Sequence, residues 1–178
     1  MFRAIAALAL LSASAHAIAA DTKAGSTLSS TAPWWEKVTV TILGDGKAQS
    51  CRYQTSIRPD ASESCEVAGS SKNAAAGVGG KGEYTRITFE RRFSPGAPDS
   101  GKVQPGDTLL GRQVLALAID AAGAVQACQI VATAGDMTTD YDCEEAKAER
   151  FEASAGRVAT HRQGFMTILV YGHAEHMV

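Results

Sequence analysis

Apolar and polar residues follow the same pattern in two stretches of the chain. Over 38–42 apolar residues alternate with threonines, which predicts a strand with one buried face, and the apolar run over 113–120 predicts another strand. The segment 38–65 reappears as 115–143, with isoleucine, glycine, glutamine and first-cysteine positions at one constant offset and one extra residue before the second cysteine of the later copy. Because self-similarity of this kind marks a repeated structural unit, the sequence predicts two similar folding units.

The first unit is expected to contain a β-hairpin, a short helical turn and a third strand. Its strands are predicted over 38–42, 49–53 and 84–89, with the helical turn at 59–65. A run of Gly, Ser and Ala over 68–82 predicts a loop, because no apolar periodicity interrupts it. The sequence therefore leaves open whether this unit has the helix of the second one.

The second unit follows the same order, with a clearer helix. Strands are predicted over 113–120, 124–133 and 165–171, and a helix over about 141–151. Thr or Asp side chains before the helix can cap it, and acidic residues early in it suit the positive helix N-terminus. The predicted fold class is therefore α+β, made of two tandem small units of antiparallel β-hairpin, helix and third strand.

The start of the chain has the pattern of an export signal. A basic residue precedes a short apolar run and then several small residues. The apolar run is shorter than the roughly 20 residues that span a bilayer, and no later run is long enough, so no stable membrane insertion is expected. We predict a soluble periplasmic protein divided into a signal peptide (1–20), a disordered linker (21–33), the first unit (34–93), a second linker (94–108) and the second unit (109–178).

Four cysteines in an exported chain favour two disulfides, because the compartment is oxidising and none is left over. Three pairings are open, and the repeat favours the two local ones, Cys51 with Cys65 and Cys128 with Cys143. Each bridge is worth about 3 kcal/mol on the chain-entropy model. Neither pair has the short spacing of a zinc site, so no metal or cofactor is expected.

Charge and motifs argue against nucleic-acid binding and catalysis. The formal net charge is −2, with both signs mixed along the chain, so no nucleic-acid partner is expected. Beyond the signal the histidines are His161, His173 and His176, and no nucleophile, phosphate-loop or zinc-protease motif accompanies them. His173 and His176 are interpreted as parts of a solvated tail. We therefore expect a protein that is not an enzyme.

The second unit combines a strand ending in Asp-x-x-Gly-x-Val, a second strand with a small turn, a helix ending near Arg and Phe, and a last apolar strand. The positions are Asp120, Gly123, Val125, Ala134, Gly135, Arg150, Phe151, Ala153 and Ile168 to Tyr171. In this order they resemble the C-terminal domain of the TonB family over about 110–171. The cysteine pair of this unit is similar to a variant in some bacterial members.

The resemblance implies a periplasmic module that binds a segment of an envelope protein, such as a TonB-dependent outer-membrane transporter, by strand addition. The edge that it implies is the last strand, Met166, Thr167, Ile168, Leu169, Val170 and Tyr171. A protein with a cleaved signal and only a short linker would not transduce energy as TonB itself does. The alternative is a structural or assembly protein of the envelope, which forms a homodimer through its sheet edges.

Overall fold

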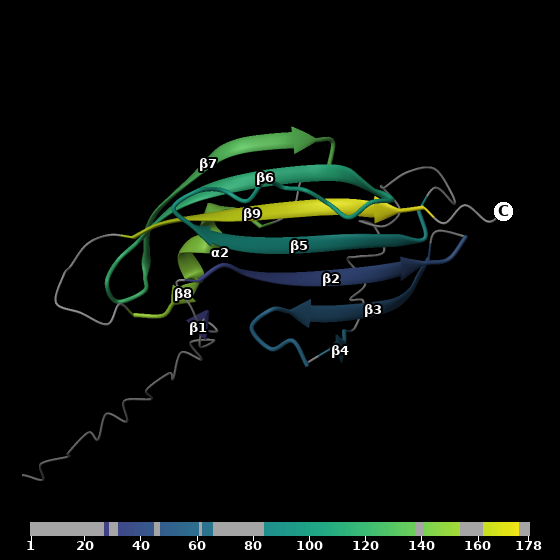
Figure 1. The fold of residues 1–178 in the computed structure, drawn as a ribbon, viewed down its shortest axis with the longest axis horizontal. Helices are drawn as coiled ribbons and strands as arrows, with labels where there is room; N and C mark the ends of the chain where they lie inside the picture. The colour runs from purple at the N-terminus through teal and green to yellow at the C-terminus, as the bar shows by residue number, and fades with distance from the viewer. Residues whose placement is uncertain are drawn as a thin grey trace, which may run out of the picture.

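The fold is known from a computed structural model (Figure 1). The predicted signal peptide, most of the predicted linker 21–33 and the Gly-rich stretch 68–82 lie outside the described residues. The structure describes residues 27–28, 32–44, 47–60, 62–65, 84–137, 141–153 and 162–174.

One antiparallel sheet of seven strands dominates the described residues, in the order β4-β3-β2-β5-β9-β6-β7 (Figure 1). Its strands are β2 (Trp34–Ile42), β3 (Ala48–Thr55), β4 (Glu63–Ser64), β5 (Arg86–Pro95), β6 (Asp107–Ile119), β7 (Val125–Gly135) and β9 (Arg162–His173). A separate parallel pair joins β1 (Thr27–Leu28) to β8 (Arg150–Phe151), and the helix α2 spans Cys143–Ala148.

The two repeats are halves of this one sheet. In each half the first strand forms a hairpin with the second and pairs with the third on its other side: β2 with β3 and β5, and β6 with β7 and β9. The halves join because β5 pairs with β9 along the whole length of β5. The expected pair of separate tandem units is therefore wrong, because the two third strands satisfy each other's backbone groups.

The predicted α+β fold class is also wrong, because strands make up most of the described residues and helix very little. The segment 59–65, predicted as a helical turn, contributes β4, which pairs with β3. The six-residue α2 lies inside the predicted range 141–151 but ends early. Its C-cap residue, Glu149, is already extended, and the backbone N–H of Phe151 donates to the carbonyl of Gly123 at 2.8 Å. Tertiary pairing thus replaces the last turns of the predicted helix.

The main core lies on the face of the sheet that carries α2. Trp34 stacks on Phe93 with ring centroids 5.9 Å apart. The ring centroids of Phe93 and Phe151 of β8 are 4.9 Å apart. Both halves contribute to this one cluster, which explains why they do not separate. Its other buried members are Leu115, Leu117, Ile119, Val125, Ala146, Met166 and Ile168.

An ion cluster ties the first half to the end of α2. Arg91 of β5 contacts Glu36 of β2 and Glu149 at 2.5 Å each, and its guanidinium lies 5.0 Å from the ring centroid of Tyr141. Burial alone would lower the pKa of Arg91, but the two carboxylates outweigh it and raise that pKa. Arg91 therefore stays charged and links elements of both halves.

The connection between the halves covers part of the opposite face. It spans 96–106, shorter than the predicted linker 94–108, because β5 continues to Pro95. Arg92 donates to Asp99 Oδ1 at 2.8 Å, and Arg112 donates to the Asp99 carbonyl at 3.0 Å. The connection is thus fastened to β5 and β6, and it crosses the sheet in Figure 1.

Both predicted disulfides are confirmed. Cys51 is bonded to Cys65 and Cys128 to Cys143, with Cα atoms 5.1 and 5.5 Å apart. Each bridge closes within its own half, and such bonds are typical of an oxidising compartment outside the cytoplasm. In the described part of the chain, no helix has the length and apolar character needed to cross a membrane.

Candidate functional site

The strand predicted as the open edge is at the centre of the sheet. Met166 to Tyr171 belong to β9, which pairs with β5 on one side and with β6 on the other. The prediction of an edge strand there is wrong, because β5 of the first half occupies the side that a lone second unit would expose. The nearly continuous apolar run 166–171 was a usable signal, since such runs are typical of strands buried on both faces.

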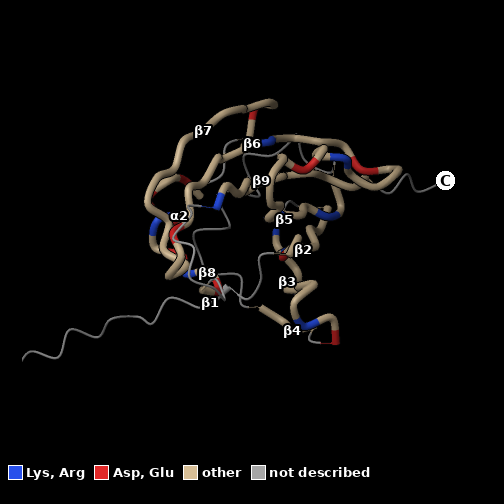
Figure 2. Tube along the Cα trace, turned by 60° about the vertical axis from the view of Figure 1, so that its left-hand side comes forward, with Lys and Arg blue, Asp and Glu red and all other residues tan. Residues whose placement is uncertain are grey.

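The long open edge is β7. In the described part of the chain it pairs with β6 alone, so the backbone groups on its outer side have no strand partner. Its eleven residues include no charged residue and no proline, and Figure 2 shows the strand without blue or red along its length. Ile130 and Val131 are 46% and 48% exposed. This is an edge without the charges that commonly prevent strand pairing.

Two irregularities divide β7 into segments. The pairing with β6 skips Gln126 near one end and Val131 near the other, and runs in regular register over 127–130. An extra residue on one strand bends that strand locally and increases its twist. The regular run 127–130 is therefore the part best suited to pair with a further strand.

The covalent and packing contacts of α2 hold β7 in place. Cys128 of β7 is bonded to Cys143 at the start of α2, and Ala146 of the helix is fully buried in the core. Asp142 accepts from the backbone N–H of Glu144 at 2.6 Å, while Glu145 accepts from the backbone N–H of Asp142 at 2.9 Å. This capping box fixes the beginning of the helix. The edge strand is thus supported on one face and open along its side.

The turn that begins β7 depends on a glycine. Gly123 has a φ of +86°, and a Cβ added there would lie 1.9 Å from the carbonyl oxygen of Phe151. Asp120 accepts from the backbone N–H of Ala124 at 2.9 Å and from the amide of Gln126 at 2.7 Å. The hydrogen bond from Ala124 is the main cause of the lowered pKa of Asp120. The turn therefore fixes where β7 leaves β6.

A shallow hollow lies beside β7 on the face opposite α2. Its floor is formed by the small side chains of Ala116, Ala118 and Ala127, with Arg162 and Gln163 at its side. We call this the alanine hollow; its volume is about 380 Å³. A strand added to β7 would direct alternate side chains toward this face.

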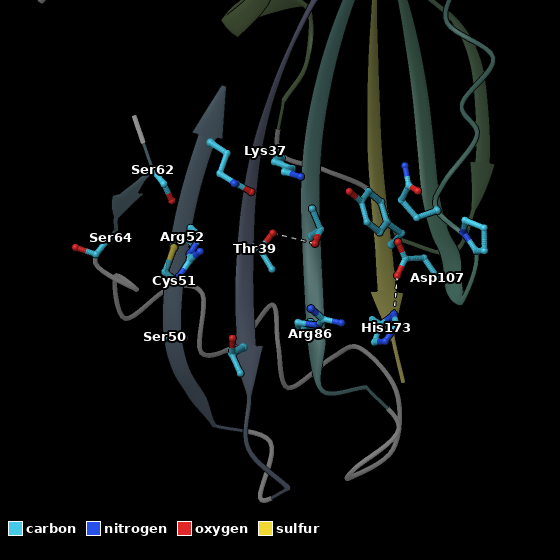
Figure 3. Close-up of a pocket in the computed structure, with 16 residues that line it drawn as sticks. Lys37, Thr39, Ser50, Cys51, Arg52, Ser62, Ser64, Arg86, Asp107 and His173 are labelled. Atoms are coloured by element: carbon cyan, nitrogen blue, oxygen red, sulfur yellow. Dashed lines mark hydrogen bonds and ion pairs between the residues drawn. The ribbon is translucent and has the colours of Figure 1, made fainter. Parts of the chain in front are cut away.

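A larger polar groove lies on the same face of the sheet, over the first half (Figure 3). Its volume is about 960 Å³, and strands β2, β3, β5 and β9 form its floor. Hydroxyl, amide and cationic side chains predominate in its lining. The lining residues are Lys37, Thr39, Thr41, Ser50, Cys51, Arg52, Gln54, Ser62, Ser64, Arg86, Thr88, Gln104, Pro105, Asp107, Tyr171 and His173.

Two carboxylates along one side of the polar groove are each bound to a neighbouring side chain. His173 Nδ1 is 2.9 Å from Asp107 Oδ1, as the dashed line in Figure 3 marks. His173 is therefore the last residue of β9 and not part of a solvated tail as predicted. Next to this pair, Tyr171 donates to the buried carboxylate of Glu90 at 2.9 Å. Burial and the charge of Glu90 raise the pKa of Tyr171, which keeps its hydroxyl protonated.

The described residues contain no cluster of three or more His, Cys, Asp or Glu side chains arranged to hold a metal ion. His161 and His176 lie outside the described residues. The chain matches no protein-family model, no curated protein and no solved structure. The similarity of the second half to the TonB C-terminal domain thus stays a prediction, and the open edge, the alanine hollow and the polar groove carry the functional argument.

Proposed function

We propose that this protein is an exported, non-enzymatic binding module that adds an extended segment of a periplasmic or outer-membrane partner to its sheet along β7. The observation that carries the proposal is the long uncharged edge, which pairs only with β6 among the described residues. In strand addition, main-chain hydrogen bonds supply affinity and side chains of alternate residues supply specificity. At this edge, the outer backbone groups of β7 can form the main-chain hydrogen bonds, and the exposed side chains beside it can supply specificity.

The side chains along β7 favour an apolar partner segment. Ile130 and Val131 expose about half of their surface, although apolar side chains of this size are usually buried. On the opposite face from α2, the alanine hollow has room for one large side chain of an added strand. We therefore expect the bound segment to carry a large apolar residue that enters the alanine hollow.

The resemblance to the TonB C-terminal domain leads to the same mode of binding by a different strand. In that family an edge strand recruits a transporter segment, and the proposed partner class here is an outer-membrane transport protein. The edge proposed for this protein is β7, because the last strand is occupied on both sides. Disulfides in both halves agree with export.

Peptide selection followed by hydrogen exchange tests the proposal. Extended peptides would be selected on the oxidised protein, and amide exchange would then be measured with and without a selected peptide. We expect slower exchange in β7 and a loss of binding in Ile130→Lys, because a charge at this position opposes strand pairing. The matched control is Leu43→Lys, since Leu43 is exposed to a similar degree, 43%, in the other half.

Two results would overturn the proposal. The first is that selected peptides slow exchange in other strands and leave β7 unchanged. The second is that Ile130→Lys and Leu43→Lys bind a selected peptide equally well.

A second candidate function follows from the same edge. An uncharged strand can pair with the β7 of another copy across a two-fold axis, which would make a homodimer with one continuous sheet. Sedimentation of the protein without peptide distinguishes the two functions. A stable dimer that Ile130→Lys dissociates would favour assembly, whereas a monomer that binds peptide through β7 would favour recruitment.

A further inference from the structure

We propose that the polar groove binds an anionic oligosaccharide, whose carboxylate or phosphate groups contact Lys37 and Arg52. This site lies on the first half of the sheet, away from the β7 edge, and does not depend on strand addition. Four observations support it: the register of the cations, the distribution of the acids, the hydroxyl lining and the pairing of the strands beneath.

The register of three strands brings the cations around one threonine. Arg52 of β3 lies directly opposite Thr39 of β2, and Lys37 is two residues before Thr39 on the same face. Arg86 of β5 lies opposite Thr41. Side chains at directly opposite or diagonal positions on one face are close enough to contact a common ligand. The floor of the groove is therefore surrounded by cations from three strands (Figure 3).

Two described carboxylates of this region, Asp107 and Glu90, are already bound by other side chains. Asp107 is the one carboxylate among the residues that line the groove, and it is paired with His173 at 2.9 Å. Glu90 lies beside Lys37 in register but accepts from Arg92 at 2.8 Å and from Tyr171 at 2.9 Å. In the described part of the chain, the lining cations Lys37 and Arg52 form no ion pair with a carboxylate. These two cations favour an anionic ligand.

The hydroxyl lining suits a sugar. Thr39 and Thr88 are 3.2 Å apart through their hydroxyl oxygens, and Thr41 and Ser50 lie opposite each other in the adjacent pair. Hydroxyl groups both donate and accept hydrogen bonds, as sugar hydroxyls do. The volume of about 960 Å³ is at the upper end of ligand sites, which leaves room for several sugar rings.

The sheet beneath the groove does not suit a peptide strand. β2 is paired with β3 and β5, β5 with β2 and β9, and β9 with β5 and β6. Their backbone groups are therefore engaged within the sheet, and a peptide could not add to them as a strand. Most of the described lining residues also carry hydroxyl, amide or charged groups, which suit a peptide side chain or a lipid chain poorly. An oligosaccharide uses side-chain hydrogen bonds and charge, which the groove supplies.

Binding of defined oligosaccharides to the oxidised protein tests the proposal. The probes are tetragalacturonate for carboxylates, a phosphorylated oligomannose for phosphates, neutral mannotetraose, tetraglutamate and inorganic phosphate. Calorimetry gives the affinity, and amide chemical shifts give the site. We expect at least one anionic oligosaccharide to bind, to shift the amides of Thr39, Thr41 and Thr88, and to bind more weakly at higher salt.

Charge-removing variants supply the controls. Lys37→Met and Arg52→Gln should each weaken binding about tenfold, since each removes one charge-assisted contact. Lys147→Gln on α2 should leave it unchanged, because Lys147 is an exposed cation on the other face. Circular dichroism of each variant checks that the fold is kept.

Four outcomes would overturn the proposal: no binding by either anionic oligosaccharide, equal binding of mannotetraose, tighter binding of tetraglutamate than of the anionic sugars, or equal affinity of inorganic phosphate. Equal weakening by Lys147→Gln would also do so, because the effect would then be one of overall charge. None of these outcomes bears on the β7 proposal, whose test uses a different edge of the sheet.

Discussion

The two edges of the sheet differ in whether a further segment covers them, although equivalent cysteines lie near both. Cys51 on β3 is bonded to Cys65, whose backbone N–H donates to the Cys51 carbonyl at 3.2 Å, so the bridge holds the short β4 along the edge of β3. Cys128 on β7 is bonded to Cys143 of α2, which lies against the face of the sheet. The same covalent device therefore covers one edge and leaves the other open.

This difference follows from what comes after the second strand in each half. In the second half, the capping box at Asp142 begins a helix, and Ala146 and Phe151 take it into the core. In the first half, Glu63 and Ser64 continue as an extended pair beside β3. A helix cannot satisfy the backbone groups of a strand edge, whereas an extended segment can. A duplicated sheet can thus protect one end and leave the other open.

The largest expected effect on stability comes from Phe151→Ala, which removes the anchor of the α2 region from the core. Deleting a buried phenylalanine costs about 3 to 5 kcal/mol of unfolding free energy. Glu63→Ala in the edge cover should cost less than about 0.5 kcal/mol, because the Glu63 side chain is largely exposed. Urea unfolding of both variants checks this. Equal losses of unfolding free energy in the two variants would contradict this prediction, because the α2 region and β4 would then stabilise the protein equally.

Removing the disulfides separates their two roles. Cys51→Ser with Cys65→Ser, and Cys128→Ser with Cys143→Ser, should each cost about 3 kcal/mol, since the closed loops have similar lengths. Loss of the first pair should also release β4 and open a second edge, so that variant should associate more at high concentration. Sedimentation compares the two. If both double variants associate equally, the edge-covering role of Cys51 and Cys65 is wrong.

The stabilisation that Asp99 gives to the contact between the halves should depend on pH. Partial burial would raise the pKa of Asp99, but hydrogen bonds from Gly101 and Arg92 outweigh it and lower that pKa. The stabilisation is therefore complete above the unfolded pKa of about 3.9 and is lost as pH falls through the lower folded pKa. Asp99→Asn should cost about 1 kcal/mol or less at pH 7, after allowing for solvent screening.

Urea unfolding of the protein and of Asp99→Asn at pH 7 and in strong acid measures this contribution. The difference between the two should shrink as the carboxyl group becomes protonated. A difference that stays constant or grows in acid would contradict the assignment to Asp99.

The smallest effect on stability is expected at the open edge itself. Val131→Lys should change the unfolding free energy by no more than about 0.5 kcal/mol, because the side chain is exposed and lies at a bulge. It should nevertheless reduce self-association, since a charged residue protects an edge strand. Light scattering at increasing concentration provides the measurement, and unchanged scattering would contradict the view of β7 as an unprotected edge.

Several elements could be predicted from the chain alone. The alternation over 38–42 and the apolar run over 113–120 predicted β2 and the C-terminal half of β6. The position of the last strand was predicted as well, but its neighbours were not. Strand periodicity reports which residues face a core, and it carries no information on which strand pairs alongside. The edge assigned to 166–171 failed for that reason.

The polar groove was beyond prediction for a related reason. Its cations lie on three strands, and only the register of those strands brings Lys37, Arg52 and Arg86 to one face. His173 was interpreted as part of a tail, because its partner Asp107 is far away in the sequence and adjacent only in the sheet. No local motif marks either arrangement.

The sequence by itself determined the duplication, the strand periods and the two local disulfides, because each depends on spacing along the chain. The tertiary structure alone decided that β5 and β9 pair, that the two halves share one core, and that β7 is the open edge. The physical reason is that an unpaired strand side is satisfied by whichever strand is available. In this chain the first copy supplied that strand to the second.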